Sequence, residues 1–301
     1  MSIESELLAN LQTETRNPRT TEMDLLSPYD LINCLHEENY GIAYAVSDSL
    51  FEISEAVRLI ADRLARGGRL FYVGAGTSGR LGVLDASECP PTFGVDKDLI
   101  QGIIAGGDFA LRNSIEGAED DEESGRSVIE TSNVNSSDVV VGIAASGRTP
   151  FVIGCLKSAR AVGALTIAVV NVKPSSMEDH ADITISAVTG PEVLTGSTRL
   201  KAGTAQKMIL NLISTGVMVL LGKTYGNLMV DVRATNAKLQ DRAIRIVMEA
   251  TGEDYAVAKN ALVRSEWSSK TAIVMILRGV SFERAEELLS ASGGFVRRAI
   301  Q

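Results

Sequence analysis

Two apolar segments of this chain each run into the same tripeptide, and this repetition constrains the fold more than any other feature. Residues 69–73 lead into a small-residue turn that carries Ser78-Gly79-Arg80. Residues 139–143 lead into a second turn that carries Ser146-Gly147-Arg148. Each pattern predicts a buried strand followed by a turn at which a helix begins, and such a turn presents N–H groups and the positive end of a helix to an anion. Two of them in one sheet predict a pocket for a phosphorylated ligand.

The segments around these turns alternate between strand and helix patterns. Strands are expected at residues 69–73, 99–105, 138–143, 164–169 and 183–187, and helices near 79–86, 108–118, 150–162 and 201–221. This alternation predicts an α/β fold, with a doubly wound parallel sheet flanked by helices and ligands bound at the carboxyl ends of the strands.

We predict three parts along the chain. Residues 1–45 form a polar N-terminal arm that is broken by Pro18 and Pro28, and residues 46–235 form the α/β domain. Residues 236–301 form a small helical C-terminal module, with no strand evident after Gly226. Helices are expected over residues 45–64, 236–250, 255–265, 269–278 and 281–290.

The composition excludes several classes of partner. With a net charge of −9 and no basic run, the chain is not expected to bind nucleic acid or an anionic membrane.

Three cysteines without CxxC spacing and two histidines argue against disulfides and a metal site, and they favour a reducing compartment. The most apolar run, residues 208–221, is shorter than the roughly 20 residues that span a bilayer and predicts a buried helix. We therefore expect a cytoplasmic protein.

The first turn also fits a nucleotide motif. Gly74, Gly76 and Gly79 match the G-x-G-x-x-G pattern directly after a strand. A dinucleotide site further requires an acidic residue about 20 positions on, at the end of the second strand, whereas Asp108 here lies beyond that strand. A purely structural tight turn is the other alternative to phosphate binding. A Walker-type site is excluded because no Gly-Lys-Ser/Thr follows either turn.

The second turn has a plain alternative as well. Ser146 or Thr149 could serve only as the N-cap of a helix that has Pro150 at its first position. Residues 190–199, which include Ser197 and are rich in hydroxyls, form a candidate third anion-binding turn before the last long helix.

Two carboxylates stand near the predicted strand ends. Glu88 precedes Pro90-Pro91, which we expect to end the helix abruptly and to leave Glu88 partly buried with the raised pKa of a general acid. Glu119 opens an acidic run after the second strand. Taken alone, each carboxylate is more commonly a solvated residue at a helix end, and the sequence alone does not single out Glu119 from its acidic neighbours.

These motifs together resemble one known family. The matching stretches, in order along the chain, are residues 13–20 (Thr-Glu-Thr-Arg-Asn-Pro-Arg-Thr), 74–82, 84–92, 104–107, 116–120, 141–150, 195–207, 226–231 and 293–297. They are similar to the N-acetylmuramic acid 6-phosphate etherases, a family of the sugar isomerase (SIS) domain superfamily. The resemblance covers nearly the whole chain.

The resemblance implies a lyase of cell-wall amino-sugar recycling or catabolism. Such an enzyme cleaves the D-lactyl ether of N-acetylmuramic acid 6-phosphate with water, by elimination and then hydration, to give N-acetylglucosamine 6-phosphate and D-lactate. The residue matching Glu88 is the acid that protonates lactate and then activates water, and the residue matching Glu119 is the other catalytic carboxylate, expected to be the C2 base. Two carboxylates in opposite protonation states suffice for this chemistry, without a metal or redox cofactor.

The resemblance also implies how the substrate is held. The phosphate and sugar would contact residues of all three turns: Gly76, Thr77, Ser78, Ser146, Gly147, Thr149 and Ser197. Many SIS domains carry a serine where this chain has Ala144, but the etherase pattern has that alanine too. SIS domains usually dimerise, so a homodimer is expected.

Two other functions fit the same fold. One is a non-catalytic sugar-phosphate sensor similar to the glucokinase regulatory protein, whose family is longer and carries two SIS domains where we find one. The other is a ketose–aldose isomerase. The presence of both Glu88 and Glu119 in their motifs favours the etherase.

Overall fold

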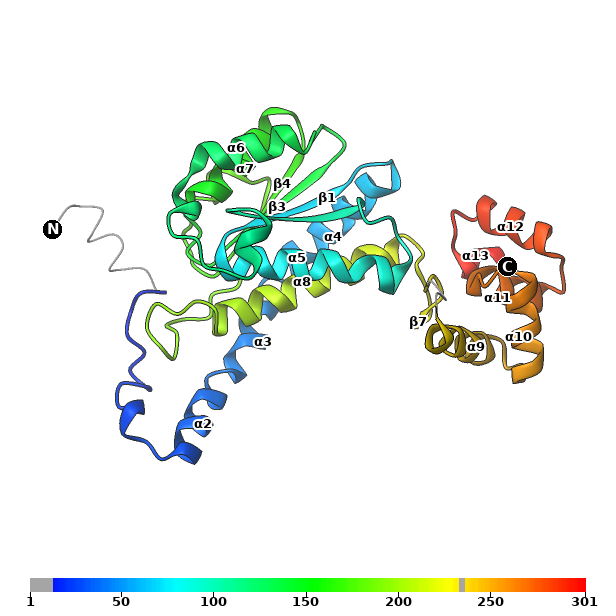
Figure 1. Cartoon of the computed structure of the whole chain (residues 1–301), viewed down its shortest axis with the longest axis horizontal. Helices are drawn as coiled ribbons and strands as arrows, with labels where there is room; N and C mark the ends of the chain where they lie inside the picture. Colours follow the sequence, from blue (N-terminus) through cyan, green and yellow to red (C-terminus); the bar gives the residue numbers. More distant parts are fainter. Residues whose placement is uncertain (1–12, 233–235) are drawn as a thin grey trace. The chain divides into compact units, whose positions relative to one another are not determined.

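The computed structural model describes residues 13–232 and 236–301 (Figure 1). Its residues group into two compact units. The first consists of the chain up to Ser87 together with Asp98–Ile213, and the second of Glu88–Lys97 together with Ser214–Gln301. The domain boundaries expected from the sequence stay a prediction.

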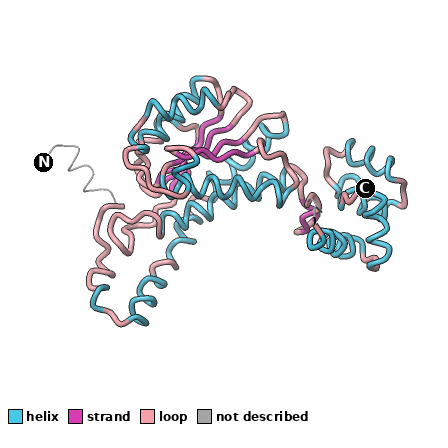
Figure 2. Tube along the Cα trace, in the orientation of Figure 1, coloured by secondary structure: helices cyan, strands magenta, loops and turns pink. Residues whose placement is uncertain are grey.

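A parallel five-stranded sheet forms the centre of the first unit, as predicted (Figure 2). Its strands lie in the order β2-β1-β3-β4-β5, and every neighbouring pair is parallel. Their bounds are Leu70–Gly74 for β1, Ile100–Ile104 for β2, Val139–Ala144 for β3, Leu165–Val170 for β4 and Ile183–Ser186 for β5. All residues of β1, β3 and β4 are buried, as expected for strands covered on both faces.

Alternating residues of β1 contact helices on opposite faces of the sheet. Phe71 and Val73 share a core with residues of α6 (Glu122–Thr131) and α7 (Pro150–Ala161). Tyr72 faces the other way, against Gly82 of α5 (Gly76–Phe93). Figure 1 shows α6 and α7 over one face, with α4 (Leu50–Ala65), α5 and α8 (Lys201–Leu220) over the other. The flanked, doubly wound α/β architecture is therefore confirmed.

Two helices differ from the prediction. The helix expected over residues 79–86 runs from Gly76 to Phe93 and continues through Pro90-Pro91. Pro90 and Pro91 lie in the last turn before Phe93, so the two hydrogen bonds that their missing N–H groups remove are lost at the end of the helix and not in its middle. The helix expected over 108–118 is absent: this stretch holds two short 3₁₀ turns, Asp108–Leu111 and Ala118–Asp120. The helix that follows, α6, begins instead at Asp121, whose side chain accepts a hydrogen bond from Ser124 N at 2.8 Å and caps it.

The N-terminal region contains more helix than expected. Pro28 begins α2 (Pro28–Glu37) rather than breaking the chain, because Ser27 caps this helix and proline fits its first position. The single helix expected over 45–64 is divided into α3 (Tyr40–Ser47) and α4. A 3₁₀ turn at Met23–Leu25 precedes α2, and another lies at Glu178–His180 before β5.

The second unit is largely helical, but it also contains a short hairpin. Thr224–Tyr225 (β6) and Leu228–Met229 (β7) pair in antiparallel fashion around Gly226, so the expectation of no strand here is wrong. The positive φ of Gly226 suits the tight turn. Five helices follow: α9 (Ala237–Thr251), α10 (Tyr255–Arg264), α11 (Ser269–Arg278), α12 (Phe282–Ala291) and α13 (Val296–Ala299). They enclose a core that includes Val247, Leu262 and Ile273.

Within the described residues, none of the helices combines the length and apolar character required to cross a membrane.

Helices α6 and α7 approach each other through glycines. A Cβ added at Gly125 would overlap the carbonyl oxygen of Phe151, and one at Gly154 would overlap that of Glu122. The two backbones are therefore in direct contact, and neither can move aside without disturbing the cover of the sheet.

We predict that Gly154→Ala lowers the free energy of unfolding by about 1–3 kcal/mol, although alanine is the better helix former, because the helices must separate. Gly41→Ala is the matched control: nothing lies within 4 Å of a Cβ added there in α3, so stability should rise by about 0.5–1 kcal/mol. Urea unfolding followed by circular dichroism measures both. A stabilising Gly154→Ala would contradict the close packing.

Candidate active site

A cavity of about 740 Å³ opens at the carboxyl ends of β1 and β3, within the first unit. The first turns of α5 and α7, one 3₁₀ turn and two loops surround it. Its lining residues are Glu14, Ala75, Gly76, Thr77, Ser78, Glu119, Asp120, Ile143, Ala144, Ala145, Ser146, Arg148, Thr149, Pro150, Gly196 and Thr198. Both predicted phosphate turns therefore face one space.

Close packing explains the glycines of the first turn. A Cβ at Gly74 would come within 2.7 Å of Gly79 N, and one at Gly79 would come equally close to Gly74 O. Gly76 has a φ of 51°, which few other residues adopt, with open space around a Cβ position. These glycines bring the start of α5 directly onto the end of β1, so its N–H groups reach the cavity edge.

Ser78 is held in a buried polar network. Its hydroxyl donates to Gln206 Oε1 at 2.8 Å, Gln206 Nε2 donates to Asn171 Oδ1 at 3.0 Å, and Asn171 Nδ2 donates to Ala187 O at 2.9 Å. All three side chains are buried. The Ser78 hydroxyl hydrogen is thus already engaged, and the residue presents its backbone to the cavity. Gln206 went unrecognised from the sequence, where its only signal is an amide in a motif that opens an apolar helix.

The second turn leaves the start of α7 open. Thr149 occupies the N-cap position with Pro150 next to it, as predicted, but among the described residues its side chain makes no capping hydrogen bond. Gly147 has a φ of 64° and packs against Ser175, whose hydroxyl donates to Gly147 O at 2.8 Å. Ser146 is half-buried at the cavity wall. The helix start therefore keeps N–H donors free of a side-chain cap.

In the third turn, the anion bound at the helix start is a carboxylate of the protein itself, that of Glu192. The carboxylate of Glu192, which is 1% exposed, accepts hydrogen bonds from Lys201 N and Ala202 N, both at 2.9 Å. It therefore occupies the positive end of α8. Ser197 is half-buried and is not among the cavity-lining residues of the described chain, whereas its neighbours Gly196 and Thr198 are.

The two predicted catalytic carboxylates lie in different surroundings. Glu119 is exposed, belongs to the 3₁₀ turn Ala118–Asp120 and lines the cavity. Glu88 is also exposed, on the uninterrupted helix α5, so the partly buried carboxylate at a helix break is not found. It belongs to the second unit and is not among the lining residues of the described chain.

Besides Asp120, which follows Glu119 in the acidic run, two further charged cavity residues were not predicted from the sequence. Glu14 comes from the N-terminal arm, and its carboxylate lies beside Gly196. Arg148 belongs to the second turn, and its Nη1 is buried without a hydrogen-bond partner among the described residues. Both lie in the motifs noted above, which gave no reason to select them. The described residues contain no cluster of His, Cys, Asp or Glu side chains that could hold a metal ion.

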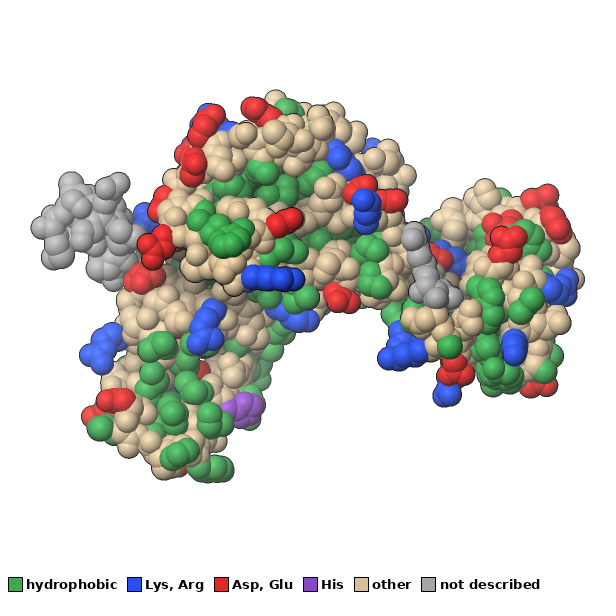
Figure 3. Space-filling view, in the orientation of Figure 1, with side chains coloured by type: hydrophobic (Ala, Val, Ile, Leu, Met, Phe, Trp, Pro, Cys, Tyr) green, Lys and Arg blue, Asp and Glu red, His purple; other side chains and the backbone are tan. Residues whose placement is uncertain are grey.

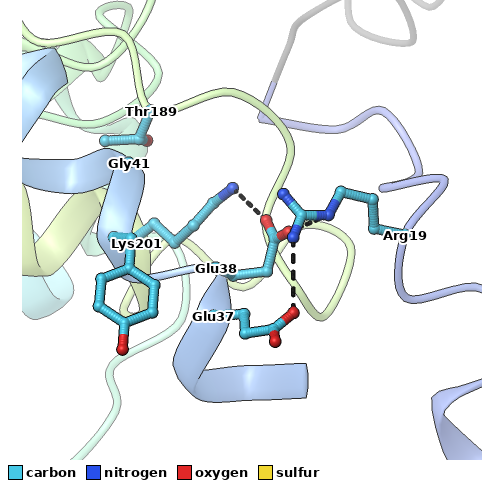
Figure 4. A pocket seen from close by; sticks show the side chains of 7 residues that line it. Arg19, Glu37, Glu38, Gly41, Thr189 and Lys201 are labelled. Atoms are coloured by element: carbon cyan, nitrogen blue, oxygen red, sulfur yellow. Dashed lines mark hydrogen bonds and ion pairs between the residues drawn. The ribbon is translucent and has the colours of Figure 1, made fainter. Parts of the chain in front are cut away.

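An ion-pair network fixes the arm beside this site and lines a second cavity of about 440 Å³ (Figure 4). Lys201 Nζ lies 2.9 Å from Glu38 Oε2, and both side chains are almost fully buried. From the arm, Asn17 Nδ2 donates to Glu38 Oε2 at 2.8 Å, and Arg19 Nε lies 3.1 Å from Glu38 Oε1. Thr20 adds a hydrogen bond to Val193 O at 2.9 Å.

The same contacts set the acidity of Glu38. Burial raises the pKa of this carboxyl, but the hydrogen bonds from Lys201 and Asn17 and the charges of Lys201 and Arg19 outweigh burial, so the pKa lies below its ordinary value. A lowered pKa in the folded state means that Glu38 stabilises the fold above its unfolded pKa of about 4.3. That contribution is lost as the pH falls through the lowered pKa.

We predict that Glu38→Gln reduces the free energy of unfolding by about 3–5 kcal/mol at pH 7, because Lys201 is left buried without its partner charge. The difference from the wild type should narrow as the pH falls below about 4.3, where the unfolded chain takes up a proton first, and it should be lost as the folded carboxylate is protonated at its lowered pKa. Glu37→Gln is the matched control, since its contact with Arg19 is exposed and should be worth at most about 1 kcal/mol. Urea titrations at several pH values test this; a difference that does not change with pH would contradict it.

Matches to domain models and to a solved structure identify the fold of this chain. The model of the glucokinase regulatory protein N-terminal SIS domain matches residues 52–160, the SIS domain model matches 123–215, and the model of that regulatory protein's C-terminal lid domain matches 226–272. A phosphoheptose isomerase from Francisella tularensis superposes with a TM-score of 0.50 at 14% identity, over 64% of this chain and 100% of that one. This isomerase shares the fold.

Relatives that match the chain over nearly its full length identify its family. It is 53% identical over 294 residues to an N-acetylmuramic acid 6-phosphate etherase of Cronobacter sakazakii, covering 98% of this chain and 99% of the relative. It is 50% identical over 294 residues to an etherase of the same name from Clostridium acetobutylicum, covering 98% and 97%. Matches of this extent and identity show that the chain belongs to the family of N-acetylmuramic acid 6-phosphate etherases.

Proposed function

We propose that this protein is a carbon–oxygen lyase that cleaves the D-lactyl ether of N-acetylmuramic acid 6-phosphate with water. The products are N-acetylglucosamine 6-phosphate and D-lactate, in the recycling or catabolism of cell-wall amino sugars. The observation that carries the proposal is the shared cavity, in which Glu119 lies with the two N–H-rich turns of α5 and α7. The full-length relatives named as etherases support the same activity.

The reaction follows from the chemistry of the open-chain sugar. Its aldehyde makes the C2 proton acidic, and a carboxylate removes that proton. The C3–O bond then breaks, the ether oxygen leaves with lactate and takes up a proton from an acid, and an α,β-unsaturated aldehyde remains. Water adds its oxygen to C3 and a proton returns to C2, so that the atoms of one water molecule balance the cleavage.

We assign the residues as follows. The phosphate binds at the starts of α5 and α7, where we assign Gly76, Thr77, Ser78, Ser146, Gly147 and Thr149 to it, and we assign Ser197 of the third turn to the same substrate by its family motif. Glu119 is the C2 base, supported by its place in the cavity. Glu88 is the acid that protonates lactate and then activates water, an assignment that rests on its family motif.

The sensor alternative is not favoured. Domain models of the glucokinase regulatory protein match parts of the chain, but the etherase relatives match it nearly end to end. We place the enzyme in the cytoplasm, because the odd number of cysteines and the absence of CxxC spacing in the sequence fit a reducing compartment.

We predict that the wild type releases D-lactate from N-acetylmuramic acid 6-phosphate, and that Glu88→Gln and Glu119→Gln each lower kcat by about 10²–10⁴-fold. Glu130→Gln, an exposed carboxylate on α6, is the control and should keep the wild-type rate. In ¹⁸O-labelled water the label should appear at C3 of the sugar and not in lactate. Label in lactate, or full activity of Glu119→Gln, would contradict the mechanism.

We also propose a homodimer. Within the described residues, α2, α3 and α4 expose large apolar side chains: Tyr29, Ile32, Tyr44 and Phe51 are 64–80% exposed. Figure 3 shows hydrophobic side chains gathered over α2 and α3. An aromatic side chain can bury about 150–250 Å², so covering this surface approaches the scale of the roughly 800 Å² per partner of a stable interface.

Sedimentation equilibrium should therefore give twice the chain mass of 32.0 kDa. Tyr44→Glu with Phe51→Glu should shift the protein to the monomer, because two charges would be buried without partners. Tyr255→Glu, also exposed but outside these helices, should leave the mass unchanged. A monomeric wild type at micromolar concentration would overturn this proposal.

A further inference from the structure

We propose that Arg148 binds the carboxylate of the substrate's lactyl group and so selects the ether substrate over sugar phosphates that lack it. The inference rests on the proposed function and adds a residue to its site. It concerns the Ser-Gly-Arg turn, whose arginine the phosphate-binding interpretation leaves without a role.

The position and the contacts of Arg148 suit the binding of an anion. The residue follows the positive-φ Gly147, precedes the start of α7 and is one of the residues that line the cavity. Its Nη1 is out of contact with solvent and has no hydrogen-bond partner among the described residues. An unpaired charged donor in a partly buried side chain is unfavourable, so a cavity ligand that draws the guanidinium into contact and supplies an acceptor gains affinity.

The other charges of the cavity direct anions toward this residue. In the described chain, Arg148 is the basic side chain among the lining residues, while Glu14, Glu119 and Asp120 are acidic. The three carboxylates repel both anionic groups of the substrate, its phosphate and its lactyl carboxylate. Each anionic group must therefore bind away from them, at the helix starts or at Arg148.

The two anionic groups have different needs. The phosphate can be held without a cation, because the starts of α5 and α7 offer N–H groups with the hydroxyls of Thr77, Ser146 and Thr149 beside them. The lactyl carboxylate matches the planar, two-pronged guanidinium of Arg148. Binding it there holds the leaving group while the C3–O bond breaks.

The test compares the substrate with a product that lacks the lactyl group. For Arg148→Gln and Arg148→Lys, kcat/KM for N-acetylmuramic acid 6-phosphate should fall by about 10- to 100-fold, with Lys the milder change. The inhibition constant of N-acetylglucosamine 6-phosphate should change by less than about twofold, because this product carries the phosphate alone. Arg242→Gln, an exposed arginine on α9, is the matched control and should alter neither value.

Two results would overturn the inference while leaving the proposed function intact. An equal loss for substrate and product would show that Arg148 binds the phosphate, and no loss for either would show that it contacts no ligand group. A folded wild type that releases no lactate would instead refute the proposed function. Unchanged binding of the product by Arg148→Gln also shows that the variant's site is folded.

Discussion

The candidate site depends on the parallel pairing of β1 with β3. The register places Gly74 opposite Ile143, so the two strands end side by side and both turns emerge at the same edge of the sheet. Each turn leads directly into a helix, and the contact of Gly74 with Gly79 brings α5 as close as a backbone can come. The two sets of N–H donors thus converge because of sheet topology, and no single side chain creates the anion site.

Charged contacts around the start of α8 hold the N-terminal arm beside the candidate site. Glu192 occupies the N–H groups of its first turn, while Lys201 of the same turn binds Glu38, which in turn holds Asn17 of the arm. The positive end of α8 is therefore neutralised by the protein's own carboxylate. This arrangement occupies the start of α8, in contrast to the starts of α5 and α7, where we propose that the substrate binds, and it fixes the arm whose Glu14 lines the cavity.

The sequence predicts the sheet closely, because strands buried on both faces appear as continuous apolar runs bounded by glycine. It predicts the two turns because their residues are adjacent along the chain. It does not predict Gln206 or Arg148, since the partner of Gln206 lies 128 positions away and the importance of Arg148 rests on what surrounds its guanidinium. The break expected at Glu88 is not found, because α5 continues through both prolines and ends only at Phe93.

The central claim is that the turns after β1 and β3 hold the substrate's phosphate. A crystal structure with bound N-acetylglucosamine 6-phosphate tests it most directly. We expect the phosphate oxygens within hydrogen-bond distance, about 2.7–3.2 Å, of backbone N–H groups at the starts of α5 and α7, with the sugar extending toward Glu119. A phosphate bound in the cavity beside Lys201, with no contact to the start of α5 or α7, would contradict the account.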